Sequence, residues 1–125
     1  MEKILLIEDE VEVADIIAKF LQRKGFTVSV AYDLEGGLEK FVPKYYTIVL
    51  LDIMLKGQKS FFLLDKIKQE SPQTLVIMVS GYDDSENIAE AKKRGADGFV
   101  PKPFKIEYLE GFLLSKIKSL RRNQE

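Results

Sequence analysis

The chain has 125 residues, of which 46% are apolar and 31% are charged, and its formal net charge is −1. This length suits one domain, spanning residues 1–125, that buries a real core. A charge near zero gives no case for a nucleic-acid-binding or membrane-binding protein. The sequence contains no cysteine and no histidine, which argues against disulfides, zinc sites and catalysis by a thiol or an imidazole.

The apolar stretches are too short to cross a membrane, and no signal-peptide pattern precedes the first predicted strand. We therefore expect a cytoplasmic protein. Because neither thiolate nor imidazole ligands are present, any bound metal should be a hard cation held by oxygen atoms.

Apolar runs of strand length alternate with segments of helical periodicity, which is typical of repeated βα units around a parallel sheet. Residues 4–7, 48–51 and 75–79 are apolar throughout, as expected of central strands covered on both faces. Residues 26–30 alternate and residues 99–100 form a short run, so these are the predicted edge strands. Helices are predicted at residues 10–24, 34–43, 61–70, 84–94 and 105–121. The pattern predicts an α/β fold, a (βα)5 doubly wound parallel five-stranded sheet with the flavodoxin-like order 2-1-3-4-5.

The predicted helices differ in the strength of their signals. Gly25 ends the first helix, whereas Gly36-Gly37 weakens the second. The fourth helix begins near Asp83 and Asp84 and finishes in basic residues, which suits the helix dipole. The basic end of the last helix is interpreted as a solvated helix end rather than a binding patch.

Polar and charged residues stand at the C-terminal ends of four predicted strands: Glu8-Asp9, Asp52, Ser80 and Lys102. In an open parallel sheet these ends share one edge, and ligands bind there. Each residue also has an ordinary interpretation. Asp9 followed by Glu12 resembles a helix capping box, Asp52 and Ser80 suit turns, and a lone lysine is usually exposed.

Taken together, these residue types suit phosphoryl chemistry. Carboxylates about 4 Å apart repel by roughly 4 kcal/mol per pair at an effective dielectric near 20, so the cluster favours a shared cation such as Mg²⁺. An aspartate beside a cation is a competent nucleophile toward phosphorus, which makes Asp52 a candidate phosphoacceptor. Lys102 can offset charge on the phosphoryl oxygens, and Ser80 can donate a hydrogen bond to one of them.

Four segments give the chain a resemblance, over essentially its whole length, to the chemotaxis-receiver-like receiver domains of two-component response regulators. The segments are Lys3–Glu10 (KILLIEDE), Leu51–Leu55 (LDIML), Ser80–Asp84 (SGYDD) and Gly95–Phe104 (GADGFVPKPF). The resemblance implies that Asp52 accepts a phosphoryl group from a phosphohistidine on a histidine kinase or phosphotransfer protein. The chain would then be a phosphoacceptor switch rather than an enzyme, with at most self-phosphorylation and autodephosphorylation.

The resemblance also implies roles for the neighbours of Asp52. Asp9, Asp52 and the backbone carbonyl of Met54 would bind Mg²⁺ or Mn²⁺, with Glu8 acting through water. Ser80 and Lys102 would hold the phosphoryl group, and Ser80 with Phe99 would form the switch. Phe99 also suits the core of a short edge strand. The Lys102-Pro103 bond resembles a cis bond of the family that directs the lysine inward.

Two departures from the family pattern follow Asp52. Receivers commonly have a proline four residues and a glycine eight residues after the phosphoacceptor, where this chain has Lys56 and Ser60. We expect loop 55–60 to follow a different path, with Gly57 supplying part of the lost flexibility.

Met54 and Tyr82 occupy the two variable positions beside the phosphoryl site, and we expect their bulk to hinder water and lengthen the phosphorylated lifetime.

Three alternatives remain at this point. A haloacid-dehalogenase-like phosphatase needs a second aspartate two residues after its nucleophile, but that position is Met54. A flavodoxin-like flavin binder needs a phosphate-cradling first loop, which Glu8-Asp9-Glu10 would repel. A degenerate receiver would act only as a protein-interaction module.

The output of the predicted switch is the surface at residues 84–121, which phosphorylation would change by shifting a two-state equilibrium. No residue there identifies the partner. A C-terminal output domain, a separate effector and a phosphorylation-dependent dimer are all open, and no direct contact with nucleic acid or membrane is expected. The chain ends where the linker to an output domain would begin, so a stand-alone and an excised receiver both fit.

Overall fold

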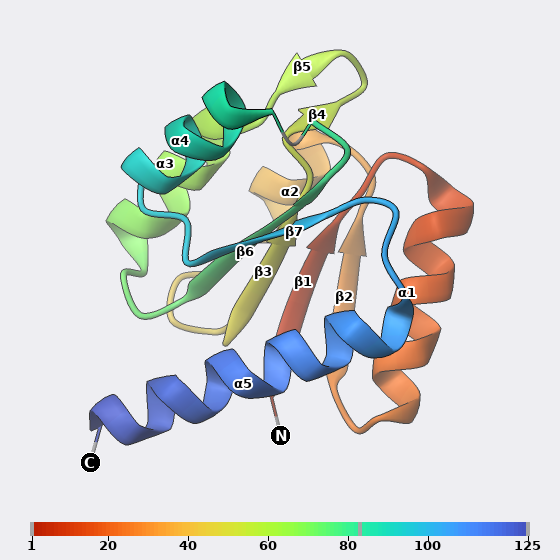
Figure 1. Ribbon diagram of the computed structural model, residues 1–125, viewed down its shortest axis with the longest axis vertical. Coiled ribbons are helices and arrows are strands. Elements are labelled where there is room, and N and C mark those ends of the chain that lie inside the picture. The colour runs from red at the N-terminus through yellow and green to blue at the C-terminus, as the bar shows by residue number, and fades with distance from the viewer. Residues whose placement is uncertain (1, 83, 125) are drawn as a thin grey trace.

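The computed structural model describes residues 2–82 and 84–124, without the side chains of residues 123 and 124. Five parallel strands form one sheet in the order β2-β1-β3-β6-β7, with helices on both faces (Figure 1). The strands of this sheet are β1 (Lys3–Ile7), β2 (Thr27–Ala31), β3 (Ile48–Leu51), β6 (Leu75–Ser80) and β7 (Gly98–Pro101). The helices are α1 (Val11–Arg23), α2 (Leu34–Lys40), α3 (Phe61–Glu70), α4 (Ser85–Lys93) and α5 (Ile106–Gln124). This confirms the predicted doubly wound, flavodoxin-like fold with its order 2-1-3-4-5.

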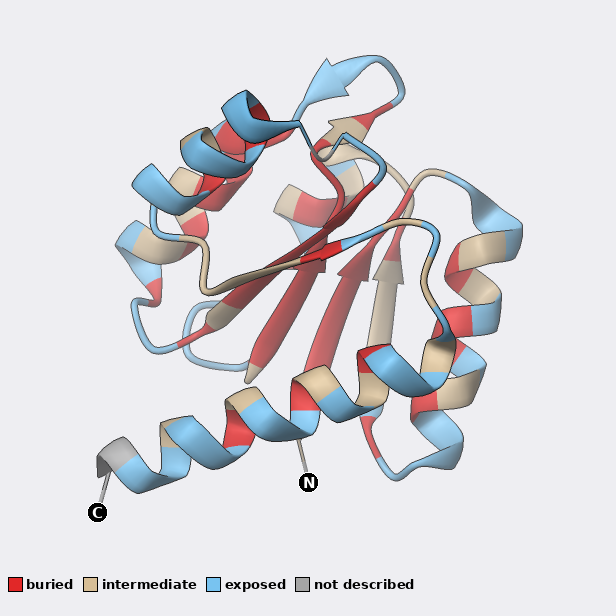
Figure 2. Cartoon of the chain, viewed as in Figure 1, coloured by how far each residue is buried: buried red, intermediate tan, exposed pale blue. Residues whose placement is uncertain are grey.

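The core consists of two apolar layers, one on each face of the sheet. Alternate residues of β1 divide between them, with Ile4 and Leu6 packed beneath α1 and α5 and with Leu5 and Ile7 packed toward α2, α3 and α4. The central strands are buried along their length, whereas β2 and the helix exteriors are more exposed (Figure 2). Uninterrupted apolar runs therefore marked the strands that are covered on both faces.

The helix boundaries agree with prediction except where local chemistry moved them. Gly25 follows α1 with a φ of 98°, a left-handed conformation that glycine adopts without strain. Helix α2 ends at Lys40 rather than residue 43, because the backbone is already extended at Phe41 and the residue before Pro43 disfavours a helix. Its Gly37 is not a defect, since a Cβ there would lie 2.9 Å from Cδ1 of Ile7 on β1.

Helix α5 extends beyond the predicted residue 121 to Gln124. Arg121 forms an ion pair with Glu2, which ties this last part of the helix to the start of β1. Asp83, predicted near the start of the fourth helix, lies outside the described residues, and Asp84 caps α4 by accepting a hydrogen bond from the N–H of Asn87.

The segment after Asp52 forms a small hairpin that the sequence analysis did not predict. Strands β4 (Met54–Leu55) and β5 (Gln58–Lys59) pair antiparallel above the C-terminal edge of the main sheet (Figure 1). Lys56 and Gly57 form its turn with φ values of 49° and 79°. Left-handed conformation at both central residues is typical of the type I′ turn that suits two-residue hairpins.

Among the helices of the described residues, none combines the length and the apolar character needed to cross a membrane.

Candidate functional site

The predicted site residues meet at the C-terminal edge of the sheet. Ile7, Leu51 and Met78 are partners across β1, β3 and β6, so Glu8 and Asp52 leave neighbouring strands at the same level. Ser80 is the last residue of β6 and pairs with Pro101 of β7, which places Lys102 one residue farther along. The parallel register therefore brings together residues that lie up to 94 positions apart.

Asp52 is the most densely bonded residue of the site. Its side chain is largely buried, with the residue 7% exposed. Oδ1 accepts hydrogen bonds from Ser80 Oγ at 2.7 Å and from the Met54 N–H at 3.2 Å. Oδ2 accepts one from Lys102 Nζ at 3.0 Å. The carboxylate is thus fixed by a hydroxyl and a cation, and the ordinary interpretations of Ser80 and Lys102 as turn and surface residues are wrong.

Lys102 also forms an ion pair with Glu8, so one ammonium bridges two carboxylates. Burial raises the pKa of the Glu8 carboxyl, although Lys102 and the N–H of Glu10 act to lower it. Burial alone would lower the pKa of the Lys102 ammonium, but hydrogen bonds to Glu8 and Asp52 outweigh it and leave the pKa raised. The single positive charge of Lys102 lies between two carboxylates and cannot neutralise both. The Lys102-Pro103 bond is cis, as predicted.

Asp9 supplies a third carboxylate to this site. One oxygen from each of Glu8, Asp9 and Asp52 lies within 4.8 Å of the others. The capping-box interpretation of Asp9 is wrong, because Glu10 is the N-cap of α1 and makes no side-chain cap. Asp9 Oδ2 instead accepts a hydrogen bond of 2.8 Å from the N–H of Lys56. Three oxygen donors within this span suit a hard divalent cation.

The predicted variable residues lie beside this cluster, whereas the predicted switch residue Phe99 packs against the core. Met54 is half-buried in β4, and Tyr82 is 48% exposed while its N–H donates to Ser80 Oγ at 3.2 Å. Phe99 is half-buried opposite Met78 on β6 and packs against the apolar layer beneath α4. It therefore belongs to the edge of the core, as one of its two interpretations requires.

Two residues treated as departures from a pattern contribute to the site. Ser60 is fully buried, and its Oγ donates a hydrogen bond of 2.5 Å to the backbone carbonyl of Asp52. Lys56 contacts Asp9 through its backbone, as described above. Side-chain type alone could not reveal a backbone donor. The Lys56-Gly57 pair between Leu55 and Gln58 was the available signal for a hairpin turn.

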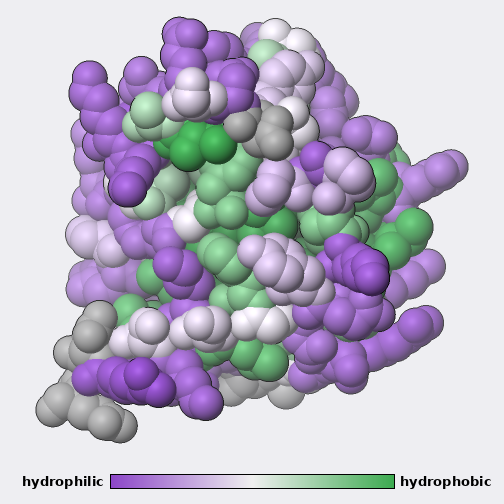
Figure 3. Space-filling model, viewed as in Figure 1, coloured by the Kyte–Doolittle hydropathy of each residue, from purple (hydrophilic) through white to green (hydrophobic). Residues whose placement is uncertain are grey.

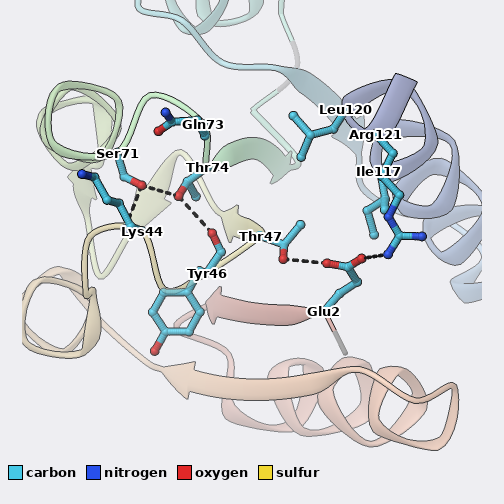
Figure 4. A pocket seen from close by; sticks show the side chains of 10 residues that line it. All are labelled: Glu2, Lys44, Tyr46, Thr47, Ser71, Gln73, Thr74, Ile117, Leu120 and Arg121. Atoms are coloured by element: carbon cyan, nitrogen blue, oxygen red, sulfur yellow. Dashed lines mark hydrogen bonds and ion pairs between the residues drawn. The ribbon is translucent and has the colours of Figure 1, made fainter. Parts of the chain in front are cut away.

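The opposite edge of the sheet holds a different polar group, beside a cavity of about 460 Å³ (Figure 4). Thr74 donates to the carbonyl of Tyr46 at 3.0 Å, and its hydroxyl lies 2.7 Å from that of Ser71. Thr47 donates to Glu2, which in turn pairs with Arg121. These groups satisfy one another and gather no excess of like charge.

Comparison with known proteins identifies the family. The family model of the response regulator receiver domain matches residues 4–113, so the chain belongs to that family. Among solved structures, a CheY-like receiver from Methanospirillum hungatei has a TM-score of 0.93 and 27% identity, with 98% of each chain covered. NtrX of Brucella abortus, solved in complex with ADP, has a TM-score of 0.89 and 31% identity, covering 99% of this chain and 29% of that one.

Curated relatives are longer than this chain. The nitrogen assimilation regulatory protein NtrX of Azorhizobium caulinodans is 33% identical over 124 residues, which cover 98% of this chain and 27% of that protein. The response regulator ArlR of Staphylococcus aureus is 32% identical, with 99% of this chain and 54% of that protein covered. The chain thus spans between about a quarter and about a half of these relatives.

Proposed function

We propose that this receiver, as a single domain spanning residues 1–125, accepts a phosphoryl group on Asp52 from a phosphohistidine of a sensor kinase or phosphotransfer protein. The observation that carries the proposal is the environment of the Asp52 carboxylate, which Lys102 and Ser80 bond directly and two further carboxylates accompany. A lysine and a hydroxyl beside an aspartate are the groups needed to receive phosphoryl oxygens.

The bond changes are those of a simple displacement. One oxygen of Asp52 attacks phosphorus, and the P–O bond forms as the P–N bond to the partner's imidazole breaks. The electron pair of the broken bond stays on the imidazole, which takes up a proton. Phosphorylation makes the Asp52 carboxylate an uncharged acyl group and places negative charge on the phosphoryl oxygens, and both Ser80 and Lys102 can then turn to those oxygens.

The carboxylate cluster fits a divalent cation, Mg²⁺ or Mn²⁺. Asp9, Asp52 and the carbonyl of Met54 would hold the ion, with Glu8 acting through water. Once bound, the ion supplies positive charge to the transferring phosphoryl oxygens. Carboxylates this close repel one another, and Lys102 offsets only part of their charge, which supports the need for a second cation.

We infer that phosphorylation is read through Ser80 and Phe99 and changes the surface at residues 84–121. Ser80 lies beside Asp52, and Phe99 lies on the neighbouring strand β7 at the rim of a shallow hollow of about 160 Å³. Apolar side chains gather between α4 and α5 in front of β7 (Figure 3), and Ile88 of α4 and Tyr108 of α5 are exposed. A two-state shift of Phe99 would alter this surface for an output domain, an effector or a second copy.

A stable mark is better supported than turnover of free substrates. A phosphatase with an aspartyl nucleophile would need an acid at Met54, and the side chain there is a thioether. The interaction-only alternative leaves five converging side chains without a purpose. The cytoplasmic location expected from the sequence stays a prediction.

The proposal is tested by incubating the protein with a small phosphodonor and Mg²⁺ and recording its intact mass. We expect an acid-stable, alkali-labile gain of one phosphoryl group that Asp52→Asn abolishes and that metal removal suppresses. Labelling that persists unchanged in Asp52→Asn would contradict the proposal. Asp65→Asn, at a half-buried position of α3 where Asp65 pairs with Arg94 and not with any residue of the site, is the matched control and should label like the wild type.

A further inference from the structure

The hairpin after Asp52 is held by the apolar core and by the loop between β1 and α1, which contains Asp9. Leu55, at the end of β4, is 1% exposed and belongs to the apolar layer beneath α2 and α3. Residues 56–59 beyond it are exposed. The tip of the hairpin therefore has little apolar burial of its own, and its position depends on polar contacts.

Lys56 makes those contacts in two directions. Its N–H donates to Asp9 Oδ2 at 2.8 Å, and its Nζ lies 3.5 Å from Asp33 Oδ2. Asp33 is itself held, because it caps α2 by accepting a 2.7 Å hydrogen bond from the N–H of Gly36. The side-chain pair is solvated and contributes little, so the backbone hydrogen bond to a charged oxygen is the stronger contact.

A proline at position 56 could make neither the turn nor the backbone contact. Proline has no N–H, and its ring holds φ near −65°, whereas Lys56 adopts 49°. The residue that departs from the receiver pattern is therefore the one that supplies a hydrogen-bond donor to an acidic residue of the site. Gly57, with a φ of 79°, completes the turn that presents this donor.

We propose that Lys56 is a positioning residue for the cation site, acting through its backbone N–H on Asp9. The inference rests on the proposed function, in which Asp9 is a metal ligand. Occupation of Oδ2 by the N–H fixes the carboxylate and leaves Oδ1 available to a cation shared with Asp52. Removal of a hydrogen-bonding partner of a metal-binding side chain commonly lowers the metal affinity by about 10- to 100-fold.

The first test compares Mg²⁺ affinity, by calorimetric titration, among the wild type, Lys56→Pro and Lys56→Gly. Lys56→Pro removes the N–H, and we expect its dissociation constant to rise about tenfold. Lys56→Gly keeps the N–H and tolerates the positive φ, and we expect a change within about threefold because only an exposed ion pair is lost. Lys59→Gly, which removes a charge from the same hairpin, is the matched control and should behave like Lys56→Gly.

Equal affinities of Lys56→Pro and Lys56→Gly would overturn the inference, as would tighter binding by Lys56→Pro, which would mean that the N–H competes with the cation. A second measurement needs no variant: hydrogen exchange of the Lys56 amide in the wild type with and without Mg²⁺. We expect its protection to be kept or increased by Mg²⁺, and loss of protection would overturn the inference even if Lys56→Pro does not fold. Absence of saturable Mg²⁺ binding by the wild type would instead overturn the proposed metal site itself.

Discussion

The two edges of the central sheet both carry polar clusters, but the clusters are built in opposite ways. At the C-terminal edge, the ammonium of Lys102 lies between Glu8 and Asp52, with Asp9 close by. At the N-terminal edge, the hydroxyls of Ser71 and Thr74 satisfy each other and a neighbouring carbonyl. Charge is left partly uncompensated at the first edge and is absent from the hydroxyl network of the second.

This difference separates a site that responds to ligands from one that stabilises the fold. Cation binding stabilises a cluster with surplus negative charge, and the charge balance of the cluster changes when a carboxylate is phosphorylated. The neutral hydroxyl network of Ser71 and Thr74 has no comparable response, and the charge of Glu2 beside it is already paired with Arg121. Substitutions at the C-terminal edge should therefore change both stability and phosphoryl chemistry, and those at the N-terminal edge should change stability alone.

The largest expected effect is that of Lys102→Met, which removes the ammonium that bridges Glu8 and Asp52. Breaking a buried pair by deleting one partner costs about 3–5 kcal/mol, and because this site is partly open to water we expect a loss of roughly 2 kcal/mol at pH 7. Without the ammonium, the pKa of Glu8 should rise further, so the deficit should shrink as the pH falls and Glu8 takes up a proton. Chemical denaturation at several pH values measures this, with exposed Lys105→Met as the control. A deficit that grows toward acid pH would contradict the charge account.

At the N-terminal edge, Thr74→Val should cost about 1–2 kcal/mol in the free energy of unfolding, because the carbonyl of Tyr46 and the hydroxyl of Ser71 lose a buried partner. Thr47→Val, at a half-buried position, should cost less. Labelling by a small phosphodonor should be unchanged in both variants. Slower labelling of folded Thr74→Val would break the distinction between the two edges.

A smaller effect is expected at the two variable positions beside Asp52. Replacement of Met54 and Tyr82 by smaller or charged groups, as in Met54→Asn and Tyr82→Glu, should admit and orient water and shorten the phosphorylated lifetime several-fold, equivalent to roughly 1 kcal/mol in the barrier. Decay of the phosphorylated mass after donor removal measures the rate. An unchanged decay in both variants would count against a shielding role.

The smallest expected effect is that of Glu8→Gln without metal. Burial raises the pKa of Glu8 above its ordinary value of 4.5, so the folded protein favours the protonated carboxyl. The stabilisation from this proton is complete below pH 4.5 and is lost as the pH rises through the higher pKa of the folded state. The neutral amide should therefore make the protein slightly more stable than the wild type at pH 7, and the gain should vanish near pH 4. Lower stability of Glu8→Gln at pH 7 than at pH 4, relative to the wild type, would show that the charged form is favoured in the folded protein.

The sequence predicted those parts of the molecule that depend on apolar periodicity and on strand ends. The buried runs of β1, β3 and β6 identified the central strands, and their register brought Glu8, Asp52 and Ser80 together as expected. The roles assigned to these residues stay predictions. Phosphoryl transfer depends on a reaction partner, which neither sequence pattern nor geometry supplies.

Contacts made by the backbone were beyond the reach of the sequence. Asp9 resembled a helix cap because its spacing to Glu12 is right, but Glu10 became the N-cap and Asp9 turned to the N–H of Lys56. Lys56 presents this donor from the left-handed turn of a hairpin of two-residue strands. So short a hairpin has almost no periodicity to detect, and its stability depends on Leu55 in the core and on contacts with distant loops.

The most direct test of the central claim is to locate the phosphoryl group on the wild-type protein. After labelling with a small phosphodonor and Mg²⁺, borohydride reduction converts an acyl phosphate to an alcohol, and peptide mass spectrometry identifies the altered residue. We expect the change at Asp52 alone. A change at Glu8 or Asp9 with Asp52 unmodified would contradict it.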